Sequence, residues 1–205
     1  NSPEYIRVLC VAYNKVGDIY QAMGSTKNAL ASYSRSLQMA KQLSKNNPAS
    51  AEFARDLFVS YNNSGDIYKT LSNPKSAMTS YNRALRIAEE LNKRNPASSG
   101  YLMDLSVTHN KIGDIYKMLG DLKNALTRYN SSLHLSEELH KRYPNSAEYT
   151  RVLSVSHDKV GNIYKTMGDL KSALASYNIS LQIAKELLRW NQDSVEFTRD
   201  LSVLY

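Results

Sequence analysis

The residues of this chain that could form a binding site recur along one helical face. Arg7, Val11, Asn14, Asp18 and Gln21 follow one another at steps of three and four residues, which places them on one side of a helix. Their amide and carboxylate groups offer donors and acceptors that can hydrogen-bond the backbone of a peptide. Similar residues return along the chain, so we predict a peptide-binding ladder that consists of Asn14, Asp18, Gln21, Asn62, Asp66, Lys69, Asn110, Asp114, Lys117, Asp158, Asn162 and Lys165.

A solvated helix face is the competing interpretation of this ladder. Asp66 and Lys69, for example, can simply neutralise each other at a spacing of three residues. Asparagine is unfavourable inside helices, however, and it stands at positions 14, 62 and 110. Its recurrence there favours a binding role.

The sequence has no recognisable catalytic or metal-binding constellation. It contains no glycine-rich phosphate loop, nucleophile elbow or His-Glu zinc motif. His134 and His140 are six residues apart and point in different directions on a helix. His109 and His157 take the positions of Tyr13 and Tyr61 in other repeats, which indicates packing. We therefore expect a protein that is not an enzyme and holds no cofactor or metal, with Cys10 as a buried or half-buried thiol.

The elements that position these residues follow from an internal repeat of 48 residues. The motif Gly17-Asp18-Ile19-Tyr20 returns at 65–68 and 113–116, and as Gly-Asn-Ile-Tyr at 161–164. Such a period predicts a solenoid, in which neighbouring repeats bury each other's apolar faces. We expect one solenoid domain over residues 1–205, with repeats at 2–49, 50–97, 98–145 and 146–193 and a partial fifth at 194–205. The glycine of the motif is expected to let the two helices of a repeat approach closely.

Each repeat is predicted to contain two helices, called here the A helix and the B helix. In the first repeat the apolar spacing predicts an A helix at about 3–23 and a B helix at about 26–46. A glycine turn separates them. Serines that share one position are expected to cap the A helices, namely Ser2, Ser50, Ser98, Ser146 and Ser194.

The repeat resembles the tetratricopeptide repeat family. The glycine, tyrosine, alanine and aromatic positions of the family pattern fall on Gly17, Tyr20, Ala29 and Tyr33, and they recur in each later repeat. The period is longer than the family's usual 34 residues. This resemblance implies an all-α fold, a right-handed superhelix of antiparallel helix pairs. It also implies a concave groove, lined by the A helices, that binds peptides or protein segments.

The leading functional prediction is therefore a non-catalytic protein–protein interaction scaffold that binds its partner in the A-helix groove. An alternative is a structural role, in which the solenoid associates with itself end to end. A third interpretation, nucleic-acid binding, draws on the net charge of +7 and on the lysine column Lys27, Lys75, Lys123 and Lys171. Glutamates on the B helices interrupt that basic surface, and few aromatic residues remain for base stacking.

Composition bears on the expected location of the chain. No run approaches the length of a membrane helix, and the first residues do not resemble a signal peptide. The single cysteine is compatible with a reducing compartment. We expect a cytoplasmic protein that makes no membrane contact.

Overall fold

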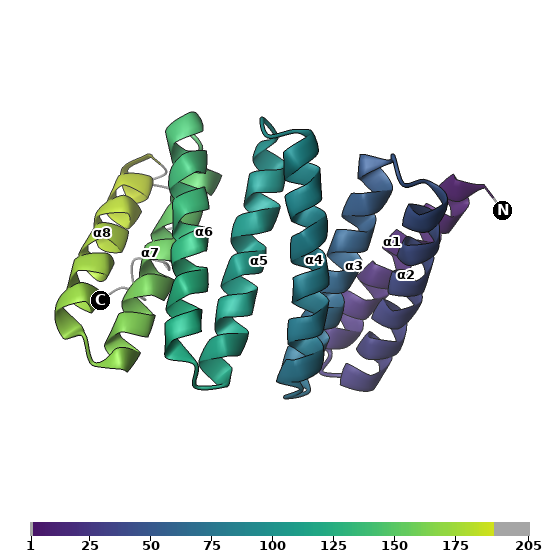
Figure 1. The fold of residues 1–205 in the computed structure, drawn as a ribbon, viewed down its shortest axis with the longest axis horizontal. Coiled ribbons are helices and arrows are strands. Elements are labelled where there is room, and N and C mark those ends of the chain that lie inside the picture. Colours follow the sequence, from purple (N-terminus) through teal and green to yellow (C-terminus); the bar gives the residue numbers. More distant parts are fainter. Residues whose placement is uncertain (1, 191–205) are drawn as a thin grey trace. The chain divides into compact units, whose positions relative to one another are not determined.

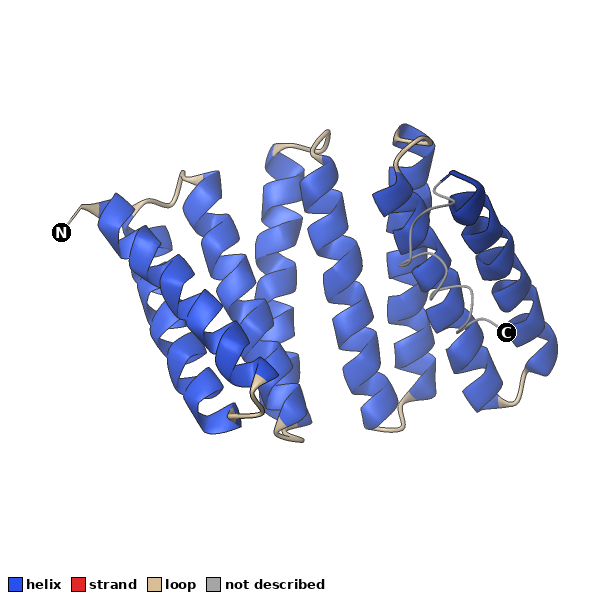
Figure 2. Cartoon of the chain, turned by 180° about the vertical axis from the view of Figure 1, so that it is seen from behind, coloured by secondary structure: helices blue, strands red, loops and turns tan. Residues whose placement is uncertain are grey.

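The computed structural model describes residues 2–190, and every regular element among them is an α-helix (Figure 2). The eight helices are α1 (Pro3–Ala22), α2 (Thr26–Asn46), α3 (Ala51–Thr70), α4 (Pro74–Arg94), α5 (Ser99–Met118), α6 (Leu122–Arg142), α7 (Ala147–Met167) and α8 (Leu170–Trp190). Successive pairs form antiparallel hairpins, one for each 48-residue repeat (Figure 1). This confirms the prediction of an all-α helical repeat solenoid. The predicted partial fifth helix at 194–205 lies outside the described residues.

The chain divides into two compact units, whose boundary lies between Tyr101 and Leu102 inside α5. Unit 1 contains α1 to α4 and the first residues of α5. Unit 2 contains the rest of α5 together with α6, α7 and α8. Each unit therefore holds about two repeats.

Each unit is held together where the B helix of one repeat meets the A helix of the next. In unit 1, Ala29 and Tyr33 of α2 form a buried cluster with Ile67 of α3. In unit 2, the buried cluster contains Tyr129 of α6 and Ile163 of α7. One helix pair cannot bury its own apolar face, so this contact between repeats supplies the core.

The turns between A and B helices depend on left-handed backbone conformations. Gly24, Gly120 and Gly168 have φ of 72°, 76° and 85°, which a glycine adopts without steric cost. In the second repeat Ser72 takes this position with φ of 54°. Glycine and serine thus end the A helix sharply and allow the antiparallel hairpin.

Serine side chains begin three of the A helices as predicted. The hydroxyl oxygens of Ser50, Ser98 and Ser146 accept hydrogen bonds from the backbone N–H three residues later, at 3.2, 3.4 and 3.3 Å. Ser2 does not cap α1 in this way, because its hydroxyl bonds Glu4 instead. Ser194 lies outside the described residues.

Among residues 2–190, no helix is long and apolar enough to cross a membrane.

Candidate functional site

The carboxylates of the predicted ladder bind tyrosine hydroxyls within their own repeats. Tyr33 donates to Asp18 at 2.7 Å, and Tyr81 donates to Asp66 at 2.7 Å. In the two later repeats Tyr129 donates to Asp114 at 2.8 Å and Tyr177 donates to Asn162 at 3.1 Å. This column of the ladder therefore fastens each B helix to its A helix.

The glycine that precedes each of these acceptors leaves space for the same tyrosine ring. A Cβ atom on Gly17 would lie 2.5 Å from a ring carbon of Tyr33, and one on Gly65 would lie 2.3 Å from Tyr81. The corresponding distances at Gly113 and Gly161 are 2.6 and 2.7 Å. The expected packing role of the glycine is confirmed. We call the glycine, the following Asp or Asn and the tyrosine the tyrosine socket.

The tyrosine sockets keep their hydroxyl groups protonated. Burial raises the pKa of Tyr33 and Tyr129 well above the ordinary value, and their hydrogen bonds to Asp18 and Asp114 raise it further. The pKa of Tyr177 is also raised, first by burial and then by the charge of Asp158. A protonated hydroxyl remains a donor, so these three tyrosines keep their hydrogen bonds at neutral pH and well above it.

Other ladder residues connect consecutive A helices inside a unit. In unit 1, the amide of Asn63 donates to Asn14 at 3.2 Å. In unit 2, the Nζ atom of Lys159 lies 2.9 Å from Asp114. Beside the ladder, Arg7 binds Asp56, and this hydrogen bond raises the pKa of the guanidinium. These bonds show that part of the ladder has a structural role.

Two ladder asparagines have buried oxygen atoms without a hydrogen-bond partner. They are the side-chain oxygens of Asn62 and Asn110, and Asn62 places its amide nitrogen on the carbonyl of Phe58 at 3.2 Å. Asp158 is half-buried, and desolvation raises the pKa of its carboxyl although Asn162 donates to it at 2.8 Å. The ladder is thus a polar helix face whose side chains are partly buried.

Three further ladder residues and three of the four valines at the position of Val11 face solvent, whereas Lys69 and Val107 are half-buried. Lys117 and Lys165 are exposed, and so is Gln21, whose Oε1 atom lies 2.9 Å from the Tyr33 hydroxyl. Three of these valines keep much of their surface accessible, with 37% at Val11, 38% at Val59 and 41% at Val155. Sequence reasoning placed these valines on the ladder face but gave them no binding role.

In unit 1 Val11 borders a hollow between α1 and α3. This hollow has a volume of about 410 Å³ and is lined by Glu4, Arg7, Val8, Val11, Glu52 and Phe53. Arg7 and Glu52 form an ion pair of 2.7 Å at its edge. An apolar side chain could enter this hollow and contact Val8, Val11 and Phe53, while the charged pair binds backbone or polar groups.

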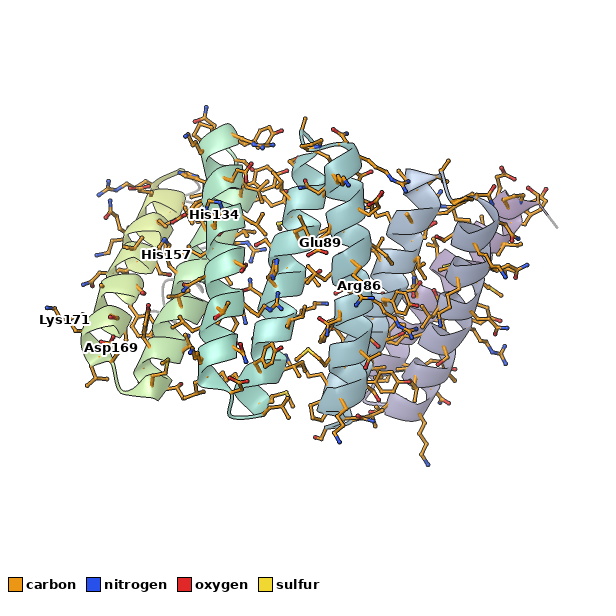
Figure 3. The ribbon with its side chains drawn as sticks, viewed as in Figure 1. Arg86, Glu89, His134, His157, Asp169 and Lys171 are labelled. Carbon is orange, nitrogen blue, oxygen red and sulfur yellow. The ribbon has the colours of Figure 1, made fainter. Side chains whose placement is uncertain are left out.

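The histidines do not assemble into a metal site. Among the described residues, no three His, Cys, Asp or Glu side chains lie together in a way that could hold an ion. His134 of α6 is exposed, whereas His157 of α7 is half-buried (Figure 3). Burial lowers the pKa of His109 to about 4, with a further contribution from Arg128. His109 therefore packs as a neutral side chain, as its position in the repeat predicted.

This burial predicts a loss of stability in mild acid. Below pH of about 6.5 the unfolded chain binds a proton at His109 while the folded chain does not, so the free energy of unfolding falls toward pH 4. We expect a decrease of about 1 kcal/mol or more from this group, measured by urea unfolding across that range. His109→Gln should flatten the dependence. His134→Gln, at an exposed site, should leave it unchanged, and an equal effect of both variants would contradict the assignment.

Cys10 belongs to a buried row of hydroxyl groups. Its sulfur lies 3.2 Å from the Ser36 hydroxyl, and Ser36 lies 3.0 Å from Ser60. The third and fourth repeats place serines in both positions, as in the pair Ser106 and Ser132 at 2.8 Å. The thiol is buried, as predicted, and it takes the place of a structural serine.

The basic column at the A–B turns is accompanied by carboxylates in unit 2. Asp169 and Lys171 both lie at the start of α8 (Figure 3). Asp169 accepts the backbone N–H of Ser172 at 3.0 Å, and Asp121 caps α6 in the same way. Since these carboxylates occupy the helix N-termini, the turns offer little to a phosphate.

Comparison with known proteins identifies the repeat. Two sequence models of the tetratricopeptide repeat match residues 8–90 and 156–187, together more than half of the chain. No curated protein sequence matches the chain.

Several solved structures have a similar fold. BtubC (BKLC) from P. vanneervenii is 21% identical with a TM-score of 0.73, over 91% of this chain and 66% of that protein. The apo form of RapI is 16% identical with a TM-score of 0.71, over 97% and 47%. The chain thus spans less than two thirds of the length of either protein. A putative kinesin light chain from Podosopora anserina with nearly identical TPR-like repeats is 10% identical, with a TM-score of 0.59, over 98% and 86%.

The 48-residue helix pairs, the glycine–tyrosine packing inside each pair and the two sequence matches agree with one another. The chain belongs to the tetratricopeptide repeat family, whose members generally serve as non-catalytic scaffolds for protein interactions.

Proposed function

We propose that this protein is a non-catalytic scaffold that binds an extended segment of a partner protein along the A helices of each unit. The observation that carries the proposal is the exposure of Val11, Val59 and Val155, which lie on the same helix face as the polar ladder. Exposed apolar side chains flanked by donors and acceptors suit a peptide, because its side chains and backbone can be bound together.

In unit 1 the segment would lie across α1 and α3. Val11 would contact an apolar side chain of the partner in the hollow that Arg7 and Glu52 border, and Val59 would contact the segment further along. The amide of Asn14 would bind the backbone of the segment. Its oxygen already accepts from Asn63, which holds the side chain in a fixed orientation.

In unit 2 the segment would lie across α7 and the part of α5 that belongs to this unit. Val155 is the exposed apolar group, and Lys117 and Lys165 present exposed ammonium groups. Long-range attraction by these lysines favours a segment that carries acidic residues. Asp158 is half-buried beside them and would accept a backbone N–H of the segment.

The aspartates of the ladder are poor sites for testing this proposal. Asp18, Asp66 and Asp114 accept the hydroxyl groups of the tyrosine sockets. Lysine substitutions there should weaken binding, but they should also destabilise the fold. The valines allow a cleaner experiment, because substitutions of exposed side chains usually change stability by less than about 0.5 kcal/mol.

We would select ligands for the native chain from a displayed library of linear peptides and measure their affinity by fluorescence anisotropy. The double variant Val11→Ser and Val59→Ser should bind a peptide selected for unit 1 about fivefold to tenfold more weakly, because it loses about 1–1.4 kcal/mol of apolar contact. Leu71→Ser is the control, since Leu71 is similarly exposed at the end of α3. Unchanged affinity in the double variant, or an equal loss in the control, would contradict the proposed site.

A further inference from the structure

Two cations from neighbouring B helices of unit 1 meet at one tyrosine of α3. The Nζ atom of Lys41, on α2, lies 5.5 Å from the centre of the Tyr61 ring. The guanidinium carbon of Arg83, on α4, lies 5.6 Å from the same centre, and its Nη1 atom donates to the Tyr61 hydroxyl at 3.2 Å. Tyr61 is only 8% exposed, whereas Lys41 and Arg83 are exposed. We call these three residues the basic cluster.

No carboxylate neutralises the basic cluster. In the part of the chain that the structure describes, Lys41 and Arg83 form no ion pair with an aspartate or glutamate. Helix α2 contains no acidic residue, and on α4 the carboxylate of Glu90 is paired with Arg94 at 3.1 Å. Two cations that share one ring repel each other, so an anion bound between them would relieve this repulsion.

The basic cluster also offers the hydrogen-bond donors that a carboxylate requires. A guanidinium has five N–H groups, and only one of those of Arg83 is bound to the Tyr61 hydroxyl. That hydroxyl accepts from Arg83, and among the described residues its own O–H group donates to no acceptor. Lys41 contributes an ammonium group. Charge-assisted hydrogen bonds of this kind are shorter and stronger than those between neutral groups.

The corresponding place in unit 2 has no such cations. His157, Glu137 and Ile179 hold the three equivalent positions of α7, α6 and α8. Burial lowers the pKa of His157, and the negative charge of Glu137 partly offsets this effect. The basic cluster is therefore a property of unit 1 and is not required by the packing of the repeat.

From these contacts we propose that the B-helix side of unit 1 binds an acidic segment of a partner protein, with one carboxylate held by Lys41, Tyr61 and Arg83. Lys45 follows Lys41 by four residues and Arg86 follows Arg83 by three, so each extends the same helix face. Both are exposed, and Arg86 lies near the middle of α4 (Figure 3). They would attract further carboxylates of the segment. This surface is separate from the proposed binding of a peptide along the A helices.

A nucleic acid fits the B-helix side of unit 1 less well. Single-stranded nucleic acids bind through bases that stack on aromatic rings, and Tyr61 is too buried to provide such a ring. Glu89 and Glu90, both exposed on α4, interrupt the basic track that a phosphate backbone would follow. A short acidic segment needs only the local cluster.

The test is the fluorescence anisotropy of a fluorescein-labelled peptide in which glutamate and alanine alternate. The native chain should bind it, with an affinity that falls as salt is added. Lys41→Gln combined with Arg83→Gln should weaken binding at least about fivefold, and Tyr61→Phe, which keeps the ring, about twofold to threefold. Lys27→Gln combined with Lys75→Gln is the control, because it removes the same charge from exposed first turns of the same helices. It should weaken binding by less than about twofold. Circular dichroism melting separates lost binding from lost folding.

Several outcomes would overturn the proposal. They are no binding by the native chain, equal binding of a peptide with glutamine in place of glutamate, and an equal loss in the control variant. Tighter binding of a labelled oligothymidylate that is lost in the same cluster variant would assign the cluster to nucleic acid instead. Val11→Ser combined with Val59→Ser should bind the acidic peptide like the native chain, and a loss there would place that peptide on the A helices.

Discussion

Replacing Gly65 with alanine should destabilise the protein by about 2–3 kcal/mol, although the same change usually stabilises a helix by up to about 1 kcal/mol. The added Cβ would lie 2.3 Å from a ring carbon of Tyr81. That ring cannot move freely, because it is fully buried and its hydroxyl is bound to Asp66 at 2.7 Å. The clash must therefore separate α3 from α4. Urea unfolding followed by circular dichroism measures the effect.

Gly100→Ala provides the matched control in the same unit. Gly100 is also helical, but a Cβ there meets its nearest neighbours at 3.7 Å, which is an ordinary contact. We expect this variant to be as stable as the native chain or slightly more stable. In a Tyr81→Ala background, Gly65→Ala should cost nothing further, since the two residues interact directly. If the two substitutions lower the free energy of unfolding additively, the ring of Tyr81 does not cause the destabilisation by Gly65→Ala.

The helices and the role of this glycine could be predicted from the sequence because they depend on periodicity. Apolar spacing predicted helices at about 3–23 and 26–46, and the structure has Pro3–Ala22 and Thr26–Asn46. The glycine recurs with a tyrosine 16 residues later in every repeat, and both lie where the two helices face each other. A position that keeps the same residue type in every repeat has the same packing role in each, so the repeat identifies the packing positions.

The candidate site was less predictable, because a helical face does not reveal which groups are already bound. Asp18 and Gln21 share a face with Asn14, yet the hydroxyl of Tyr33 reaches both from the B helix. That contact depends on the closeness of the two helices, which spacing along one helix does not encode. The sequence could not predict that Val11, Val59 and Val155 are exposed, because the burial of a side chain depends on the neighbouring helix.

Above pH of about 10 the protein should lose stability steeply through its tyrosine sockets. The pKa values of Tyr33, Tyr129 and Tyr177 are raised, so the folded chain keeps protons that the unfolded chain releases. Stability from these groups is fully present below pH of about 10 and falls as pH rises toward the folded pKa values. Each tyrosine contributes at most about 1.4 kcal/mol per pH unit. We expect less, because the Asp18 acceptor is exposed to solvent.

Tyr129→Phe separates this effect from general alkaline unfolding. At neutral pH the variant should be about 1–2 kcal/mol less stable, because Asp114 loses the tyrosine hydroxyl but keeps Lys159. Above pH of about 10 the difference in free energy of unfolding between the native chain and the variant should narrow. The native chain loses the contribution of Tyr129 there, whereas phenylalanine has no proton to lose. Urea unfolding combined with tyrosinate absorbance tests both statements. Tyr5→Phe, at an exposed site, should follow the native curve, and a constant deficit of Tyr129→Phe at every pH would refute the hydroxyl's role.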